Sequence, residues 1–152
     1  MATFPVNLLR FDLSKDLILS TPHESAQLLI SLYDLRREEK MREARHWVVR
    51  SFHPDSVEDY RTTMKTDEFT YVRQVMSYWD MAASFVVHGA IIPEMFQAVS
   101  GEMLAAYCKV EHMIDELRED QKVMLYKNIE EVAADWPMAK KRMSHMREYF
   151  KS

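Results

Sequence analysis

Histidines that lie about one helical turn from a carboxylate are the residues of this chain best suited to chemistry. Glu43 and His46 are three residues apart and His112 and Glu116 are four apart, so each pair would share one face of a helix. Such a pair could exchange protons with a substrate or supply ligands to a metal. A ferritin-like centre needs Glu-x-x-His on two helices, however, and this chain has one such pair and no His-Glu-x-x-His motif. We therefore expect no metal and no organic cofactor, and solvated helix faces explain the pairs better.

Nucleophilic and nucleotide chemistry also lack the residues that they need. Cys108 is the single cysteine, and its spacing from Leu104 and Tyr107 places it on an apolar helix face. The chain has no Gly-x-Ser-x-Gly motif, and its two glycines cannot form a phosphate-binding loop. We predict no catalytic residue. The alternative is a small enzyme whose acid or base, His112 or His46, lies in an interhelical pocket with a carboxylate.

The elements that carry these residues are predicted to be helices throughout. Of the 152 residues 47% are hydrophobic and 29% charged, and two glycines with five prolines leave few places for tight turns. Only TFPVNLLRF, near the N-terminus, could be extended, and it has no other strand to pair with. We predict one all-α domain over residues 1–152, an irregular antiparallel bundle of about six or seven helices.

Capping residues and prolines set the first helix boundaries. Thr21-Pro22-His23-Glu24 is a capping box, which predicts that a helix begins at Pro22 with Thr21 as its N-cap. Apolar residues then recur at helical spacing, so one long helix is expected to reach Phe52, because Pro54 prevents its continuation.

Later boundaries rest on weaker patterns. Thr66 is expected to cap a helix that forms much of the core, Asp120 to cap one that runs to Trp136, and Pro137 to open the last, which ends near Phe150. The predicted buried face of the core helix consists of Phe69, Val72, Val75, Met76, Trp79, Ala83, Val86 and Val87.

The His88-Gly89 pair is predicted to end that core helix. A helix commonly closes with a left-handed glycine, followed by an apolar contact and then by proline, and Gly89, Ile91 and Pro93 occur in that order. His88 falls in the last turn, where a partial positive charge suits the helix dipole. We interpret Gly89 and Pro93 as structural helix stops rather than as a site.

This stretch also carries a family resemblance. The sequence VRQVMSYWDMAASFVVHGAIIPEMF resembles an uncharacterised bacterial family of helical domains of unknown function, many of which follow an N-terminal membrane anchor. The likeness extends loosely from Leu29 to Trp136 and implies an all-helical fold, with no established activity and no catalytic residue. The matching residues are Val75, Tyr78, Trp79, Ala82, His88, Gly89, Ile91 and Glu94.

His53-Pro54-Asp55, which follows a basic helix, is similar to the His-Pro-Asp motif of J-domain co-chaperones. That resemblance would imply that His53 and Asp55 act on a heat-shock ATPase, and it gives a third reading of the function. A helix stop explains the tripeptide without function, because Asp55 or Ser56 can cap a short helix that runs to Tyr60.

Charge and hydropathy exclude several partners. The net charge of −4 and pI of about 5.9 give no positive field for a nucleic-acid backbone. No stretch is long and uncharged enough for a transmembrane helix, and charged residues interrupt the apolar N-terminus, so we expect neither membrane insertion nor an export signal. The lone cysteine favours a reducing compartment, and we predict a soluble cytoplasmic protein.

The remaining features favour binding over chemistry. Twelve methionines suit an adaptable core or partner surface, and the basic C-terminal helix could face an anionic partner. Residues 1–20 form an apolar arm that must be covered, either by the body or by a second subunit. We therefore predict a non-catalytic interaction or scaffold module that forms a homodimer. We also expect it to bind another protein, whose identity the sequence does not indicate.

Overall fold

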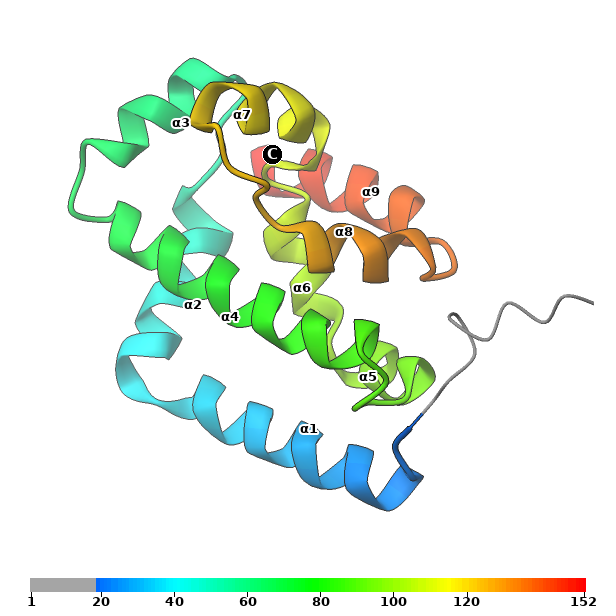
Figure 1. The fold of residues 1–152 in the computed structure, drawn as a ribbon. Helices are drawn as coiled ribbons and strands as arrows, with labels where there is room; N and C mark the ends of the chain where they lie inside the picture. The colour runs from blue at the N-terminus through cyan, green and yellow to red at the C-terminus, as the bar shows by residue number, and fades with distance from the viewer. Residues whose placement is uncertain (1–18) are drawn as a thin grey trace, which may run out of the picture.

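Helices provide all the regular secondary structure of residues 19–152, the part of the chain that this computed structural model describes (Figure 1). The all-α class expected from the sequence is confirmed. In chain order the elements are α1 (Pro22–Arg37), α2 (Glu39–Ser51), α3 (Val57–Met64), α4 (Phe69–Val87), α5 (Pro93–Val99), α6 (Gly101–Tyr107), the short 3-10 helix η1 (Glu111–Met113), α7 (Ile114–Gln121), α8 (Lys127–Ala134) and α9 (Ala139–Lys151).

Nine α-helices in the described range exceed the expected six or seven because long predicted helices are interrupted. The prediction of a single helix from Pro22 to Phe52 is wrong, because the chain turns at Glu38 and forms α1 and α2 instead. The φ and ψ angles of Glu38 are −57° and 141°. The Glu38 carboxylate accepts the backbone N–H of Met41 at 2.9 Å, and Arg45 donates to the freed carbonyl of Arg36 at 3.0 Å. Side chains thus replace the helical hydrogen bonds lost at the turn.

The predicted cap at Asp120 is also wrong. Asp120 lies inside α7 and pairs with Arg61 of α3. α8 begins later, and the backbone N–H groups of Asn128 and Ile129 donate to the carboxylate of Asp80, on α4, at 3.0 and 3.2 Å. The first turn of α8 is therefore capped by a different helix.

Two other expected starts differ by a few residues. The Thr66 hydroxyl donates to the Thr63 carbonyl at 2.7 Å, so it does not cap α4, which begins at Phe69. The last helix begins at Ala139 rather than at Pro137, because Met138 adopts a left-handed φ of 63°. In both cases the residues predicted to begin the helix form a turn, and the helix begins just after it.

α4 crosses the middle of the fold and carries much of the core, packing chiefly against α2 and α8 (Figure 1). Of its predicted buried face, Phe69, Val86 and Val87 are half-buried and the rest is buried. The buried members of that face are Val72, Val75, Met76, Trp79 and Ala83.

α4 ends at the left-handed glycine that the sequence predicts. Gly89 has a φ of 76°. Its N–H donates to the Val86 carbonyl at 3.0 Å, and the N–H of Ala90 donates to the Phe85 carbonyl at 2.8 Å. These two hydrogen bonds form a Schellman cap, and Ile91 behind it is fully buried.

Replacing Gly89 with valine should lower the free energy of unfolding by about 2 kcal/mol, because a β-branched residue is strained at positive φ. The other glycine offers a matched control. Gly101 does not have a positive φ, and a Cβ there would meet only the flexible end of Arg142 at 3.2 Å. Gly101→Ala should therefore change stability by less than about 0.5 kcal/mol. Thermal unfolding that responds equally to both variants would contradict the cap.

α1 lies at one edge of the molecule, across α4 from α7, α8 and α9 (Figure 1). Only Ser25 and Leu32 are buried among its 16 residues, whereas Ile30, Tyr33 and Leu35 are 64%, 55% and 55% exposed. The helix therefore leaves much of its apolar surface uncovered.

Candidate functional site

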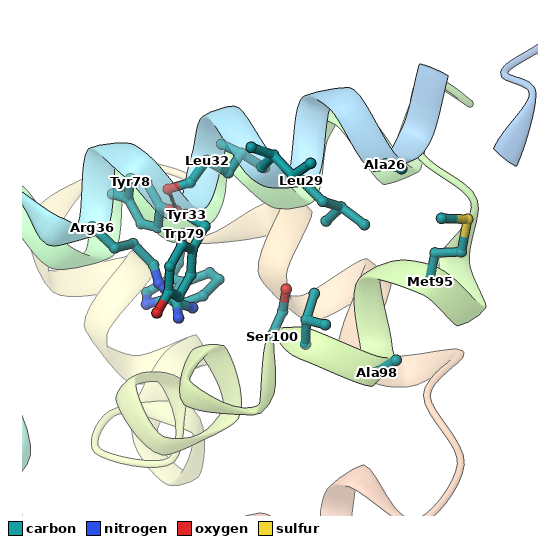
Figure 2. A pocket seen from close by; sticks show the side chains of 12 residues that line it. Ala26, Leu29, Leu32, Tyr33, Arg36, Tyr78, Trp79, Met95, Ala98 and Ser100 are labelled. Atoms are coloured by element: carbon teal, nitrogen blue, oxygen red, sulfur yellow. Dashed lines mark hydrogen bonds between the residues drawn. The ribbon is translucent and has the colours of Figure 1, made fainter. Parts of the chain in front are cut away.

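An apolar groove, which we call the α1–α5 groove, runs between α1 and α5 with α4 as its floor (Figure 2). Its volume is about 440 Å³, within the range of pockets that bind ligands or peptide side chains. It is lined by Ala26, Leu29, Ile30, Leu32, Tyr33, Arg36, Tyr78, Trp79, Met95, Ala98, Val99 and Ser100.

The rim of the groove exposes large apolar side chains from both walls. Ile30 and Tyr33 project from α1, and Val99, which is 58% exposed, lies at the end of α5. Single exposed hydrophobic residues are common, but a contiguous set around a concave surface is typical of an interaction site.

One end of the groove is aromatic and positively charged. Arg36, Tyr33, Tyr78 and Trp79 gather there, away from Ala26, Met95 and Ala98 (Figure 2). The Arg36 guanidinium carbon lies 5.2 Å from the centroid of the Trp79 ring and 5.3 Å from that of Tyr33. Its charge is thereby held over two rings whose faces are electron-rich.

Two buried N–H donors at this end have no acceptor. Nε of Arg36 and Nε1 of Trp79 are both shielded from solvent and make no hydrogen bond, and Trp79 is 1% exposed. Arg36 forms no ion pair with any carboxylate in residues 19–152, whereas the Tyr78 hydroxyl is already used, donating to the Leu32 carbonyl at 2.7 Å. The groove thus has apolar walls, and the two unsatisfied donors are covered by protein atoms at one end of it.

A second polar cluster lies where the end of α9 packs near the end of α2. Lys109, only 3% exposed, donates through Nζ to the Val49 carbonyl at 2.9 Å, and that nitrogen lies 2.9 Å from Nδ1 of His53 and 4.1 Å from the centre of the Phe150 ring. Burial lowers the pKa of Lys109 to about 8 and, together with the Lys109 charge, lowers the pKa of His53. The enclosed amine therefore joins the end of α2 to the end of α9.

Asp55 belongs to the margin of this cluster, and its predicted role as a helix cap is wrong. Its carboxylate pairs with Lys151 of α9. The cap of α3 is Ser56, whose hydroxyl accepts the N–H of Asp59 at 3.2 Å while the Asp59 carboxylate accepts the N–H of Ser56 at 3.1 Å. Ser56 therefore forms a reciprocal capping box that leaves Asp55 free for the ion pair.

The structure brings His53, Asp55 and His112 together but leaves His46 apart. His112 is exposed beside Arg147, and partial desolvation with that positive charge lowers its pKa. His46 is exposed on α2, where the neighbouring Glu43 accepts the Tyr71 hydroxyl at 2.7 Å. Neither histidine lies in the α1–α5 groove, and no cluster of potential metal ligands occurs between Leu19 and Ser152.

Cys108 is fully buried, and burial raises the pKa of its thiol to about 11. Its Sγ lies 3.2 Å from the Ala105 carbonyl and donates to it. A protonated, enclosed thiol is a poor nucleophile, which agrees with the apolar role expected from its spacing.

Sequence reasoning missed the groove, although one indication was present. Leu28, Leu29, Ile30, Leu32, Tyr33 and Leu35 supply more apolar residues than one face of a helix can bury. The unpaired donors at Arg36 and Trp79 could not have been found, because they depend on how α1 lies over α4.

Residues 21–136 match the family described as Domain of unknown function (DUF4760). The chain belongs to this family. The resemblance to an uncharacterised family of helical domains is thereby confirmed. The matched range of the DUF4760 domain includes every residue that lines the α1–α5 groove and ends before α9. No curated protein and no solved structure matches the chain significantly.

No helix among the described residues of the DUF4760 domain is both long and apolar enough to cross a membrane.

Proposed function

We propose that this domain is a non-catalytic interaction module that docks an apolar protein segment in the α1–α5 groove. The observation that carries the proposal is the groove itself, a concave apolar surface whose rim is formed by Ile30, Tyr33 and Val99. A small enzyme would need a histidine and a carboxylate in such a pocket, and the groove contains neither. Its lining therefore favours binding over chemistry.

We propose further that the occupant is the apolar N-terminal arm of a second copy of the chain. Residues 1–18 lie outside the described range, which begins at Leu19, shortly before α1. The N–H of Leu19 donates to the Gly89 carbonyl at 3.2 Å. Eighteen residues can span up to about 60 Å when extended, which is enough to reach a neighbouring copy. The apolar residues of the arm that need cover are Phe4, Val6, Leu8, Leu9, Phe11 and Leu13.

An exchange of arms about a twofold axis would cover both apolar surfaces at once. Each arm would fill the groove of the other copy, and closed twofold symmetry is the commonest arrangement of homo-oligomers. This arrangement also accounts for an edge helix, α1, with so few buried residues of its own.

Light scattering at micromolar concentration should report a dimer for the full chain. Val99→Asp should convert it to a monomer, because a carboxylate at the apolar rim would be desolvated by the docked arm. Removal of residues 1–19 should also weaken the dimer.

Val123→Asp provides the matched control, since Val123 is 56% exposed but lies after α7, outside the groove. It should leave the dimer intact. A full chain that is strictly monomeric would contradict the proposal.

A further inference from the structure

The contact between the end of α9 and the end of α2 depends on one imidazole and one ammonium. Nζ of Lys109 donates to the Val49 carbonyl and lies at hydrogen-bond distance from Nδ1 of His53. The Phe150 ring of α9 packs over both groups, with its centre 4.1 Å from that Nζ and 6.4 Å from the centre of the His53 ring. Phe150 therefore rests on the cation and on the imidazole together.

The hydrogen bonds of His53 determine which of its nitrogens carries a proton. Nε2 lies 3.0 Å from the Arg50 carbonyl, which can only accept, so Nε2 is the donor. An ammonium can only donate, so Nδ1 is the acceptor from Lys109 and has no proton. His53 is thus neutral, and the pair carries one positive charge.

A further proton would break the hydrogen bond of this pair. Two cations would then face each other at a distance of 2.9 Å, with no acceptor between them. The other charged groups that face His53 do not offset the repulsion. Lys151 of α9 adds a third positive charge, and the carboxylate of Asp55 is already paired with Lys151.

A second histidine faces the same part of α9. His112, in η1, lies near Arg147 and Lys151, and the neighbouring Glu111 is already paired with Arg147. Acidification therefore adds positive charge to an end of α9 whose own cations have their carboxylates in place.

We propose that His53 is an acid-sensitive latch for the last turn of α9, residues 147–151. When the pair of His53 and Lys109 takes up a second proton, Phe150 leaves the ammonium and this turn separates from α2. The latch lies apart from the α1–α5 groove and goes beyond the proposed function, because it acts whether or not the groove is filled.

The direction of the pH dependence follows from linkage. Burial, together with the Lys109 charge, lowers the pKa of His53 in the closed form, whereas an open imidazole has its ordinary pKa of about 6.5. The closed form is fully favoured above pH 6.5 and loses stability as the pH falls from 6.5 toward the lowered pKa. The equilibrium constant for opening can therefore rise by up to about thirtyfold between pH 7.5 and pH 5.

Amide hydrogen exchange of the full chain, followed by NMR, tests the latch. Protection factors relate each amide to its own intrinsic exchange rate, so the pH dependence of exchange itself cancels. Between pH 7.5 and pH 5 the protection factors of residues 147–151 should fall by about threefold to thirtyfold. The amides of α4 should remain at least about a hundredfold better protected, because the opening is local.

Three asparagine variants assign the response. His53→Asn places an amide oxygen near the position of Nδ1 and does not titrate, so the response should drop below about twofold. His145→Asn, which changes an exposed histidine of α9 itself, is the matched control and should keep the wild-type response. His112→Asn should keep at least a threefold response, about the lower limit expected for the wild type.

A full response in folded His53→Asn overturns the proposal, and so does its loss in His112→Asn. The wild-type protein provides a test that does not depend on any variant. The nuclear Overhauser contact between the Phe150 ring and the Lys109 side chain should weaken as the Cε1 proton of His53 reports protonation. A contact of unchanged strength in the protonated protein overturns the latch.

Discussion

Lys109 is expected to contribute a rise of about 2 kcal/mol to the free energy of unfolding between pH 7 and pH 9.5, because folding holds its amine in a place where the charge is unfavourable. Burial lowers the pKa of Lys109 from 10.5 to about 8. Below pH 8 both states carry the proton and the folded state bears the full cost of the buried charge. Between pH 8 and 10.5 the folded state has lost the proton and the unfolded state still binds it, so stability increases with pH.

Groups whose pKa is raised by burial act in the opposite direction. The Cys108 thiol, with a pKa raised to about 11, does so within this window, and tyrosines do so above it. Burial raises the pKa of Tyr78 to about 12 and also raises the pKa values of Tyr107 and Tyr126. Their unfolded forms ionise near pH 10, so their contribution is complete below that pH and is lost as the pH rises further. Stability should therefore pass through a maximum near pH 9.

Lys109→Met isolates the contribution of the amine. Methionine keeps the length of the side chain and cannot titrate, so chemical denaturation of this variant should show no rise between pH 7 and 9.5, and a fall as the Cys108 thiol ionises in the unfolded state. Lys140→Met, an exposed substitution on α9, should keep the wild-type slope. A difference in stability between the wild type and Lys109→Met that does not change between pH 7 and 9.5 would contradict the assignment.

Asp80→Ala is expected to lower the free energy of unfolding by about 2 to 3 kcal/mol, since hydrogen bonds to a charged acceptor contribute more than neutral ones. The variant would leave the first turn of α8 without its cap and remove the contact of Asp80 with the Asn128 side chain, also at 3.0 Å. Equilibrium denaturation measures the loss. Hydrogen exchange should show the amides of Asn128 and Ile129 exchanging faster, ahead of the rest of α8.

Two further variants make the Asp80 experiment specific. Asp80→Asn keeps one acceptor oxygen and should lose less stability than alanine. Ser77→Ala, an exposed change nearly one turn earlier on α4, should have almost no effect. Equal losses for Asp80→Ala and Ser77→Ala would mean that Asp80 does not cap α8.

The features that could be predicted from the sequence are those whose partners lie close along the chain. The cap at Thr21 is formed with Glu24, and the cap at Gly89 closes on Phe85 and Val86. The buried face of α4 was predictable for a similar reason, because helical spacing alone determines which residues share a face.

The missed features depend on residues brought together by the fold. Asp80 caps a helix that begins 47 residues later, and Lys109 reaches His53 across 56 positions. No local pattern distinguishes such partners from other polar residues on a helix. The same reason applies to Arg36 and Trp79, which meet only when α1 lies over α4.

The sparse anchoring of α1 has a consequence for how the domain opens. An edge helix with only two fully buried side chains can separate from the body at a lower free energy than global unfolding requires, and we expect it to do so as one cooperative unit. Anything that fills the space between α1 and α5 adds its binding free energy to that local opening step. Proteolytic cleavage within α1 should therefore slow when the groove is occupied, which makes this edge helix a reporter of whether the groove is filled.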